Sequence, residues 1–305
     1  MRGKVVPSIR MLHLMLALTQ RHVKCDIHYD DQNKIISLKF ERNKIIPFFE
    51  LRKNLMKTYK CTVCGQPSML FDVVDFNKSC EEIRGQYLPL LGHGVYYARC
   101  TACKYTFAPE FCAWTDQDFL NMIYNDDYVK VDPDYLSIRP KGNADALHNI
   151  FGTSCAQINH LDYGGGNGVL SSSLVSRQWS FKSYDPFPEN DVALANLGRF
   201  NLITAFEVFE HVPNPHAMME TIEKLLSGPD AVIFFSTLIS DGCINEGERL
   251  NWWYVAPRNG HIGIHSTQSL TVLSEMYGMS FYSLNAGTHI FYKSLPIWAE
   301  RLISK

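Results

Sequence analysis

Short apolar runs alternate with amphipathic stretches in the second half of the chain. The hydrophobic pattern predicts strands and helices in turn, at 156–163 (strand), 169–177 (helix), 180–184 (strand), 200–206 (strand), 215–227 (helix) and 231–238 (strand). The last of these runs is apolar without alternation, as is typical of a strand buried on both faces. Strands that alternate with helices predict an α/β fold with a parallel sheet and helical crossovers.

The pattern continues to the end of the chain and is weaker before residue 145. A helix is predicted at 266–277 with Ser266 as its N-cap, and two strands at 280–284 and 290–293 flank a hairpin-type turn. Earlier stretches predict a strand at 35–40, helical structure at 47–59 and 116–124, and a connection at 125–134. We therefore divide the chain into an extension (1–56), a cysteine-bearing module (57–112), a helical linker (113–144) and a main domain (145–305).

Composition narrows the class of protein. The chain has 305 residues, 46% hydrophobic and 20% charged, which is ordinary for a globular protein and excludes a disordered or collagen-like chain. A net charge of −2 provides no general attraction to nucleic acid, although a local basic patch remains open. The apolar run at 11–18 is too short to span a bilayer, so we expect a soluble protein with no membrane partner.

Four of the nine cysteines form two C-x-x-C pairs, Cys61 with Cys64 and Cys100 with Cys103. Such pairs place four thiolates on tight turns, as tetrahedral structural zinc requires. The 35 residues between them exceed the spacing of a compact zinc ribbon, so a folded segment is expected there. The alternative is four unliganded thiols. The odd cysteine count favours reduced thiols and hence the cytoplasm over a disulfide framework.

A glycine loop follows the strand predicted at 156–163. It contains Asp162, Gly164, Gly166 and Gly168 in the order D-x-G-x-G-x-G. The dinucleotide fingerprint G-x-G-x-x-G requires a third glycine at 169, where this chain has Val169. Glycines at such a turn let the backbone approach a ligand closely.

This loop resembles that of class I S-adenosylmethionine-dependent methyltransferases. The resemblance implies a Rossmann-like, mostly parallel sheet of the seven-stranded type with helices on both faces. Only 186–200 separate Asp185 from the next strand, so the sheet is expected to be abbreviated. Asp162 would meet the cofactor's ammonium group and Asp185 its ribose. The full implied cofactor set is Asp162, Gly164, Gly165, Gly166, Asn167, Gly168, Asp185, Phe206 and Glu207.

The segment after the strand predicted at 200–206 reads E-x-x-E-H, with Glu207, Glu210 and His211. It resembles a methyltransferase branch that includes ubiquinone-pathway O-methyltransferases, bacterial sugar or natural-product enzymes and small-RNA 2′-O-methyltransferases. The resemblance implies that these three residues and His261, rather than His265, bind a divalent metal. Two alternatives stay open: His211 or His261 is a general base beside Glu207, or the motif only holds the loop.

Substrate residues are expected close to His261. Trp253, Tyr254 and Arg258 are the candidates for an aromatic wall with one cation, against the alternative that they are core residues and a loop anchor. Arg139 is a further candidate for an anionic substrate group. The cysteine module itself resembles the amino-terminal zinc region of sugar C-methyltransferases, in architecture rather than in chemistry.

These observations together predict an enzyme. It would transfer a methyl group from S-adenosylmethionine to a small polar acceptor, such as a sugar, natural product or related metabolite, at oxygen. One alternative is a 2′-O-methyltransferase of RNA ends, which the net charge of −2 disfavours. Another is a catalytically inactive, zinc-binding interaction protein, which would not bind S-adenosylmethionine.

Overall fold

The computed structural model describes residues 25–29, 35–40, 45–47, 58–186 and 194–303, in two compact units, Met1–Lys57 and Thr58–Lys305. The first unit contains an antiparallel three-stranded sheet in the order β1-β2-β3 (Cys25–Tyr29, Ile35–Phe40, Ile45–Pro47). The strand predicted at 35–40 is confirmed. The apolar run 11–18 and most of the helical stretch 47–59 lie outside the described residues.

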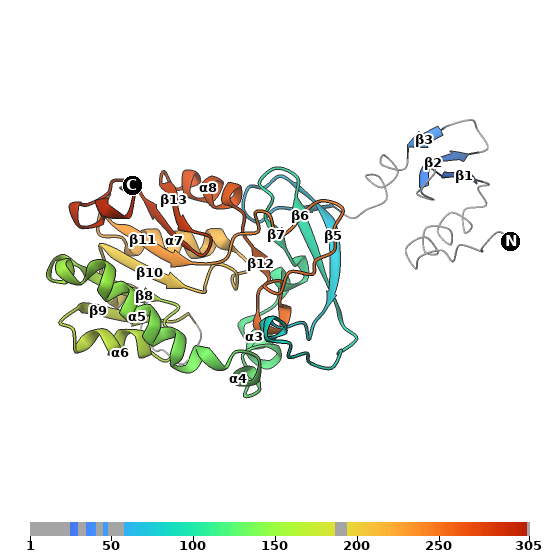
Figure 1. Cartoon of the computed structure of the whole chain (residues 1–305). Coiled ribbons are helices and arrows are strands. Elements are labelled where there is room, and N and C mark those ends of the chain that lie inside the picture. The colour runs from blue at the N-terminus through green and yellow to red at the C-terminus, as the bar shows by residue number, and fades with distance from the viewer. Residues whose placement is uncertain (1–24, 30–34, 41–44, 48–57, 187–193, 304–305) are drawn as a thin grey trace. The chain divides into compact units, whose positions relative to one another are not determined.

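A six-stranded sheet forms the centre of the second unit (Figure 1). Its strand order is β13-β14-β11-β10-β8-β9. The four strands β9, β8, β10 and β11 run parallel, and β14 pairs antiparallel with both β11 and β13. The bounds are β8 (Asn159–Tyr163), β9 (Ser180–Tyr184), β10 (Leu202–Phe206), β11 (Val232–Ser236), β13 (Ser280–Asn285) and β14 (Thr288–Tyr292).

Helices cover both faces of this sheet because its central strands are apolar on both sides. In β11, Val232 and Phe234 pack in one core with α5 (Ile138–Phe151) and α6 (Val169–Val175). The alternate residues Ile233 and Phe235 pack in another core with α7 (Pro215–Leu225) and α8 (Thr267–Met276). The structure thus confirms the strand buried on both faces that the continuous apolar run predicted.

The predicted α/β architecture is confirmed, and several element ends differ by a few residues. The strand expected from 156 begins at Asn159, because 152–157 form a 3₁₀ helix. Ser266 caps α8 as predicted, with its side chain accepting from the Ser269 N–H. Among the described residues the sheet has six strands, where the family pattern has seven. Most of the stretch after Asp185 in which the abbreviation is expected, 187–193, lies outside the described residues.

The cysteine pairs belong to a second, five-stranded antiparallel sheet in the order β12-β7-β6-β5-β4. The bounds are β4 (Thr58–Lys60), β5 (Pro67–Asp75), β6 (Gly94–Cys100), β7 (Thr106–Phe107) and β12 (Gly263–Ile264). The last strand comes from the main-domain part of the sequence. The predicted cysteine module is therefore completed by residues far away in the chain.

The segment between the two sheets is more helical than its sequence suggested. α3 (Asp116–Met122) confirms the helix expected at 116–124, with Thr115 and Asp118 forming a capping box. The stretch 125–134, expected to be a connection, contains α4 (Tyr128–Val131). No helix among the described residues is long and apolar enough to cross a membrane.

Candidate functional site

The glycine loop turns tightly between β8 and α6. The N–H groups of Gly164 and Gly165 both donate to the Tyr184 carbonyl, at 2.8 and 3.2 Å. A Cβ atom on Gly165 would lie 2.2 Å from Oγ of Ser183 and 2.6 Å from Oδ2 of Asp162. Glycine is therefore required at 165 because the backbone passes directly over the end of the sheet.

Asp162, the last residue but one of β8, is a buried carboxyl with an incomplete set of hydrogen bonds. Its Oδ1 accepts from the Thr204 hydroxyl at 3.2 Å, and its Oδ2 has no hydrogen-bond partner among the described residues. Burial, with a smaller contribution from Asp185, raises the pKa of Asp162 to about 7. An orphaned buried acceptor of this kind calls for a cationic donor from a ligand.

Asp185 directly follows β9, the neighbouring parallel strand. Its Oδ2 accepts a hydrogen bond from the Gly166 N–H at 2.8 Å. Asp162 and Asp185 thus lie at the carboxyl ends of adjacent strands, where open α/β sheets bind their ligands.

A cavity of about 590 Å³ opens on this edge of the sheet. That volume lies within the usual range for small-molecule sites. One side is formed by the glycine loop and its flanking acids: Asp162, Gly164, Gly165, Gly166, Asn167 and Asp185. Further lining comes from 114–143, from Phe206 at the end of β10, and from the segment after it, including Glu207 and His211. The cavity thus brings most of the predicted cofactor set together; Gly168 is not among its described lining residues.

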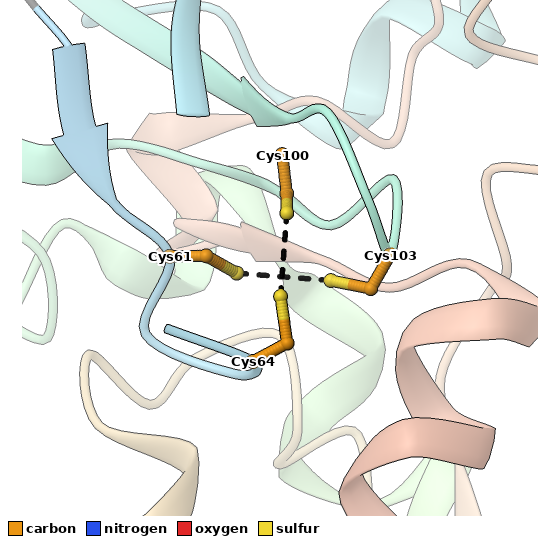
Figure 2. A group of neighbouring side chains, drawn as sticks. All are labelled: Cys61, Cys64, Cys100 and Cys103. Carbon is orange, nitrogen blue, oxygen red and sulfur yellow. Dashed lines mark hydrogen bonds between the residues drawn. The ribbon is translucent and has the colours of Figure 1, made fainter. Parts of the chain in front are cut away.

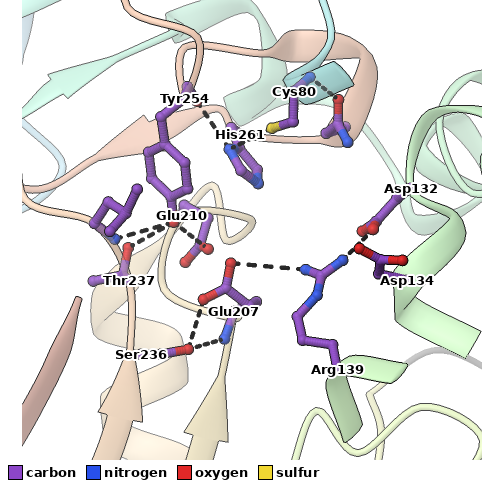
Figure 3. A network of polar contacts seen from close by, with 12 residues as sticks. Cys80, Asp132, Asp134, Arg139, Glu207, Glu210, Ser236, Thr237, Tyr254 and His261 are labelled. Carbon is purple, nitrogen blue, oxygen red and sulfur yellow. Dashed lines mark hydrogen bonds and ion pairs between the residues drawn. The ribbon is translucent and has the colours of Figure 1, made fainter. Parts of the chain in front are cut away.

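Glu207 stands at the floor of the cavity in a left-handed backbone conformation, with φ of 53°. Its Oε1 accepts from the Ser236 hydroxyl at 2.6 Å, and the backbone N–H of Glu207 donates to Oγ of Ser236. Its Oε2 lies 3.8 Å from the Arg139 guanidinium, which also pairs with Asp132 (Figure 3). Arg139 is the only lysine or arginine among the described residues that line the cavity.

Glu210 is fully buried beneath this floor. The Tyr254 hydroxyl donates to its Oε1, while its Oε2 has no partner among the described residues (Figure 3). Burial, together with the negative charge of Glu207, raises the pKa of Glu210 well above its ordinary value. The carboxyl therefore favours its protonated form unless a cation joins it.

His211 lines the cavity, and His261 lies behind it. Their ring centroids are 4.9 Å apart, and Nδ1 of His211 lies 3.0 Å from the Tyr124 hydroxyl. Burial lowers the pKa of both imidazoles, to about 4 for His261 and well below its ordinary value for His211. One ligand atom each from Glu210, His211 and His261 lies within 4.8 Å of the others, close enough for one metal ion.

One member of the expected set lies outside this group. Glu207 points to Ser236 and Arg139, so the structure places three rather than four of the predicted divalent-metal ligands together. His265, the second-choice histidine, is buried between Tyr105 and Phe209 in the core. The preference for His261 agrees with this geometry.

The expected substrate residues need a correction. None of Trp253, Tyr254 and Arg258 is among the described residues that line the cavity. Arg258 donates instead to the Ile123 carbonyl at 2.9 Å, so it anchors the loop, and the Tyr254 hydroxyl is engaged by Glu210. The alternative assignment, core and loop anchor, describes them better.

An aromatic wall from the linker takes their place in the cavity. It consists of Trp114, Phe119, Tyr124, Tyr128 and Tyr135. Neighbouring rings are in contact along it, with centroids 5.3 Å apart for Trp114 and Phe119 and 5.2 Å for Tyr124 and Tyr128. The repeated aromatic residues at 114–135 were the available signal, but a segment interpreted as a connection gave no reason to place them at a site.

The four paired cysteines converge at the edge of the five-stranded sheet (Figure 2). Their sulfur atoms all lie within 4.8 Å of one another, at 3.7 Å for Cys61 with Cys103 and 3.4 Å for Cys64 with Cys100. A tetrahedral zinc with Zn–S bonds of about 2.3 Å separates its sulfur ligands by about 3.8 Å. The four residues fit a closed, four-coordinate zinc site.

Comparisons with known proteins find similarity in the part of the chain that contains Asp162, Asp185 and His211. Residues 135–284 match a family model described as a methyltransferase domain. A ubiquinone biosynthesis O-methyltransferase of Glaesserella parasuis is 28% identical over a match that covers 32% of this chain and 57% of the relative. The corresponding enzyme of Pasteurella multocida is 32% identical, over 26% of this chain and 45% of the relative. The chain thus spans about half the length of the curated relatives it matches.

Two solved structures are similar at low sequence identity. A plantazolicin methyltransferase in complex with SAH is 11% identical, with a TM-score of 0.43 over 61% of this chain and 97% of the other. A Burkholderia thailandensis 1,6-didemethyltoxoflavin-N1-methyltransferase is 15% identical, with a TM-score of 0.41 over 69% and 99%. The match of residues 135–284 to the methyltransferase-domain model, which covers just under half of the chain, does not depend on these two structures.

Proposed function

We propose that this chain transfers a methyl group from S-adenosylmethionine to a hydroxyl oxygen of a small polar acceptor, such as a sugar, natural product or related metabolite. One observation carries the proposal: two acids at the carboxyl ends of β8 and β9, one of them with an orphaned buried oxygen, flank a glycine loop on a cavity that also contains His211. The methyltransferase-domain match covers the same residues.

The cofactor side of the cavity fits the chemistry of S-adenosylmethionine, which supplies an activated methyl group on sulfur. Asp162 offers its unpartnered Oδ2 to an ammonium group, and Asp185 offers carboxylate oxygens to ribose hydroxyls. Gly165 leaves room for the Ser183 and Asp162 side chains, which a Cβ atom there would overlap, so Asp162 can keep its place beside the ligand. Alignment of the two reactants and exclusion of water are then the main tasks of the protein.

The acceptor side must remove a proton from the attacking hydroxyl. His211 is the cavity-lining imidazole, and its lowered pKa keeps it neutral and able to accept a proton at neutral pH. We propose it as the general base, with Glu207 and Arg139 fixing the cavity floor. The aromatic wall offers ring faces for the acceptor to pack against.

The second way to activate the hydroxyl uses a divalent metal. Glu210, His211 and His261 would hold the ion, and the orphaned Oε2 of Glu210 is an observation in its favour. A bound metal would lower the pKa of the acceptor hydroxyl as a Lewis acid. Elemental analysis separates the two possibilities, because the metal-bound form requires a second ion besides the zinc proposed at the four cysteines.

The cysteine site completes the proposal. We propose that Cys61, Cys64, Cys100 and Cys103 bind structural zinc, since four protein ligands leave no open position for chemistry. Thiolate ligands require a reducing compartment, which supports a cytoplasmic location.

Transfer of labelled methyl from S-adenosylmethionine into fractionated cell extract, with and without chelator, tests the function. Label in small-molecule or glycan fractions is expected. Label in RNA would replace the proposal with RNA-end methylation, which the five acids and single arginine among the described lining residues disfavour. Calorimetry with S-adenosylmethionine runs in parallel, because absence of both binding and transfer would favour an inactive interaction protein.

A further inference from the structure

The five-stranded cysteine sheet is joined directly to the site through residues 260–266, which we call the backing segment. This segment contains Gly260 and His261 and continues into β12, which pairs with β7 three residues after Cys103. It lies behind His211, so it connects two regions that the sequence places in different domains.

Contact between the backing segment and His211 is close. A Cβ atom on Gly260 would lie 2.9 Å from Nδ1 of His211 and 2.8 Å from the Tyr124 hydroxyl. The N–H groups of Ile262 and Gly263 both donate to the Glu210 carbonyl at 3.0 Å. A displacement of this segment therefore moves the support of the E-x-x-E-H motif itself.

The cysteine sheet holds the other side of the backing segment. The hydroxyl of Tyr97, a fully buried residue of β6, donates to the His261 carbonyl at 2.7 Å. The Ala108 N–H donates to the Ile262 carbonyl at 2.8 Å, and the Ser266 hydroxyl donates to the Cys103 carbonyl at 2.7 Å. Two of these three bonds involve the proposed zinc site closely: Tyr97 lies on β6, which ends at Cys100, and the Ser266 bond is made to Cys103 itself.

A second connection runs from the first cysteine pair. Nε2 of His216, in the first turn of α7, lies 2.7 Å from the carbonyl of Val63, which lies between Cys61 and Cys64. α7 follows the E-x-x-E-H motif directly. Both cysteine pairs are thus bonded to segments next to His211: α7, which follows it in the sequence, and the backing segment, which contacts it in space.

We infer that the cysteine sheet positions the catalytic side of the cavity, with Tyr97 as its positioning residue, and that zinc at the four cysteines stabilises this arrangement. The inference rests on the proposed function for its effect on turnover, and on the bonds above for its geometry. Tyr97 is not among the described residues that line the cavity. Its loss should therefore change turnover and leave cofactor binding intact.

Tyr97→Phe is the test, because it removes one hydroxyl and keeps the buried ring. Tyr96→Phe is the matched control: it makes the same change one residue away on the same strand, where the side chain is 49% exposed. We expect Tyr97→Phe to lower kcat roughly three- to tenfold with an unchanged Kd for S-adenosylmethionine. Tyr96→Phe should match the wild type in both. Equal kcat in the two variants, or a weakened cofactor affinity in Tyr97→Phe, would overturn the inference.

A second measurement does not depend on catalysis. In full-length protein labelled with ¹⁵N-histidine, stripping the metal and restoring it with Zn²⁺ should shift the ring signals of His211 and His261 reversibly in the wild type and leave them unmoved in Cys100→Ser. Direct binding of Zn²⁺ to these two histidines would instead move the signals in both proteins and would overturn the inference. The signal of His160, buried on β8 against Thr204, should stay in place. Ring signals of His211 and His261 that do not change with the metal would refute the coupling even if methyl transfer itself were never detected. Failure of this inference is therefore distinguishable from failure of the proposed function.

Discussion

The Tyr124 hydroxyl lies 3.0 Å from Nδ1 of His211, although 87 residues separate them in the chain. Gly260 makes the contact sterically feasible, since any side chain there would meet both groups. An imidazole that donates from Nδ1 keeps the lone pair on Nε2, which is the form that accepts a proton or binds a metal. The Tyr124 hydroxyl is therefore placed where it could accept from Nδ1 and hold His211 in this tautomer.

Tyr124→Phe removes this hydroxyl and leaves the ring in the aromatic wall. We expect kcat to fall roughly two- to tenfold, the value of one hydrogen bond, with an unchanged Kd for S-adenosylmethionine. Steady-state kinetics and calorimetry measure the two. The control is Tyr87→Phe at a side chain that is 72% exposed. A Tyr124→Phe enzyme with wild-type kcat would show that the contact only packs the wall.

Cys100→Ser should remove the metal and destabilise the second unit. Loss of a structural metal belongs to the largest effects of single substitutions, and about 3 kcal/mol or more shifts the melting temperature of a domain this size by roughly 6 to 12 °C. Elemental analysis of the purified protein should give one zinc per chain in the wild type and none in the variant. Cys243→Ser, at an exposed free cysteine, should keep both zinc and melting temperature. Equal melting temperatures for Cys100→Ser and Cys243→Ser would exclude a structural zinc.

Gly165→Ala tests the cradle under the cofactor. The added methyl group would overlap Ser183 and Asp162, so we expect a loss of about 1–3 kcal/mol in stability and at least tenfold weaker binding of S-adenosylmethionine. Gly142→Ala, in helix α5 with nothing within 4 Å of the added methyl, is the matched control and should gain about 0.5–1 kcal/mol. Thermal melts measure the change in stability, and calorimetry measures the affinity for S-adenosylmethionine. Unchanged cofactor affinity in Gly165→Ala would place the ligand elsewhere.

Local patterns predicted the sheet and its glycine loop well, because each signal lay within a short stretch. Asp162, Asp185 and the apolar run in β11 each depend on neighbours close in sequence. The acceptor side was not predictable in this way. Trp114 and Tyr124 reach the cavity only because the linker folds over it, and β12 joins the cysteine sheet across more than 150 residues. The prediction for Arg258 was wrong in the other direction. Its position near His261 in the sequence suggested a substrate contact, whereas its guanidinium donates to the Ile123 carbonyl.

The raised pKa of Asp162 should make the affinity for S-adenosylmethionine depend on pH. In the free protein burial raises this pKa to about 7, whereas the ordinary value is 3.8. An ammonium ligand needs the carboxylate, so binding below pH 7 must release a proton. We expect the affinity for S-adenosylmethionine to fall up to tenfold for each pH unit below 7 and to level off above it. Calorimetry in two buffers of different ionisation enthalpy measures the proton released.

Stability of the free protein should move in the opposite direction. Between pH 4 and 7 the folded state holds a proton on Asp162 that the unfolded state has lost, so the free energy of unfolding decreases as the pH rises through this window. Above about 7 both states are ionised and this contribution stops changing. Asp162→Asn keeps the shape and removes the charge, so it should flatten both pH profiles and weaken S-adenosylmethionine binding roughly tenfold or more. An Asp162→Asn protein that retains wild-type affinity and its pH dependence would show that the buried carboxyl does not meet the cofactor.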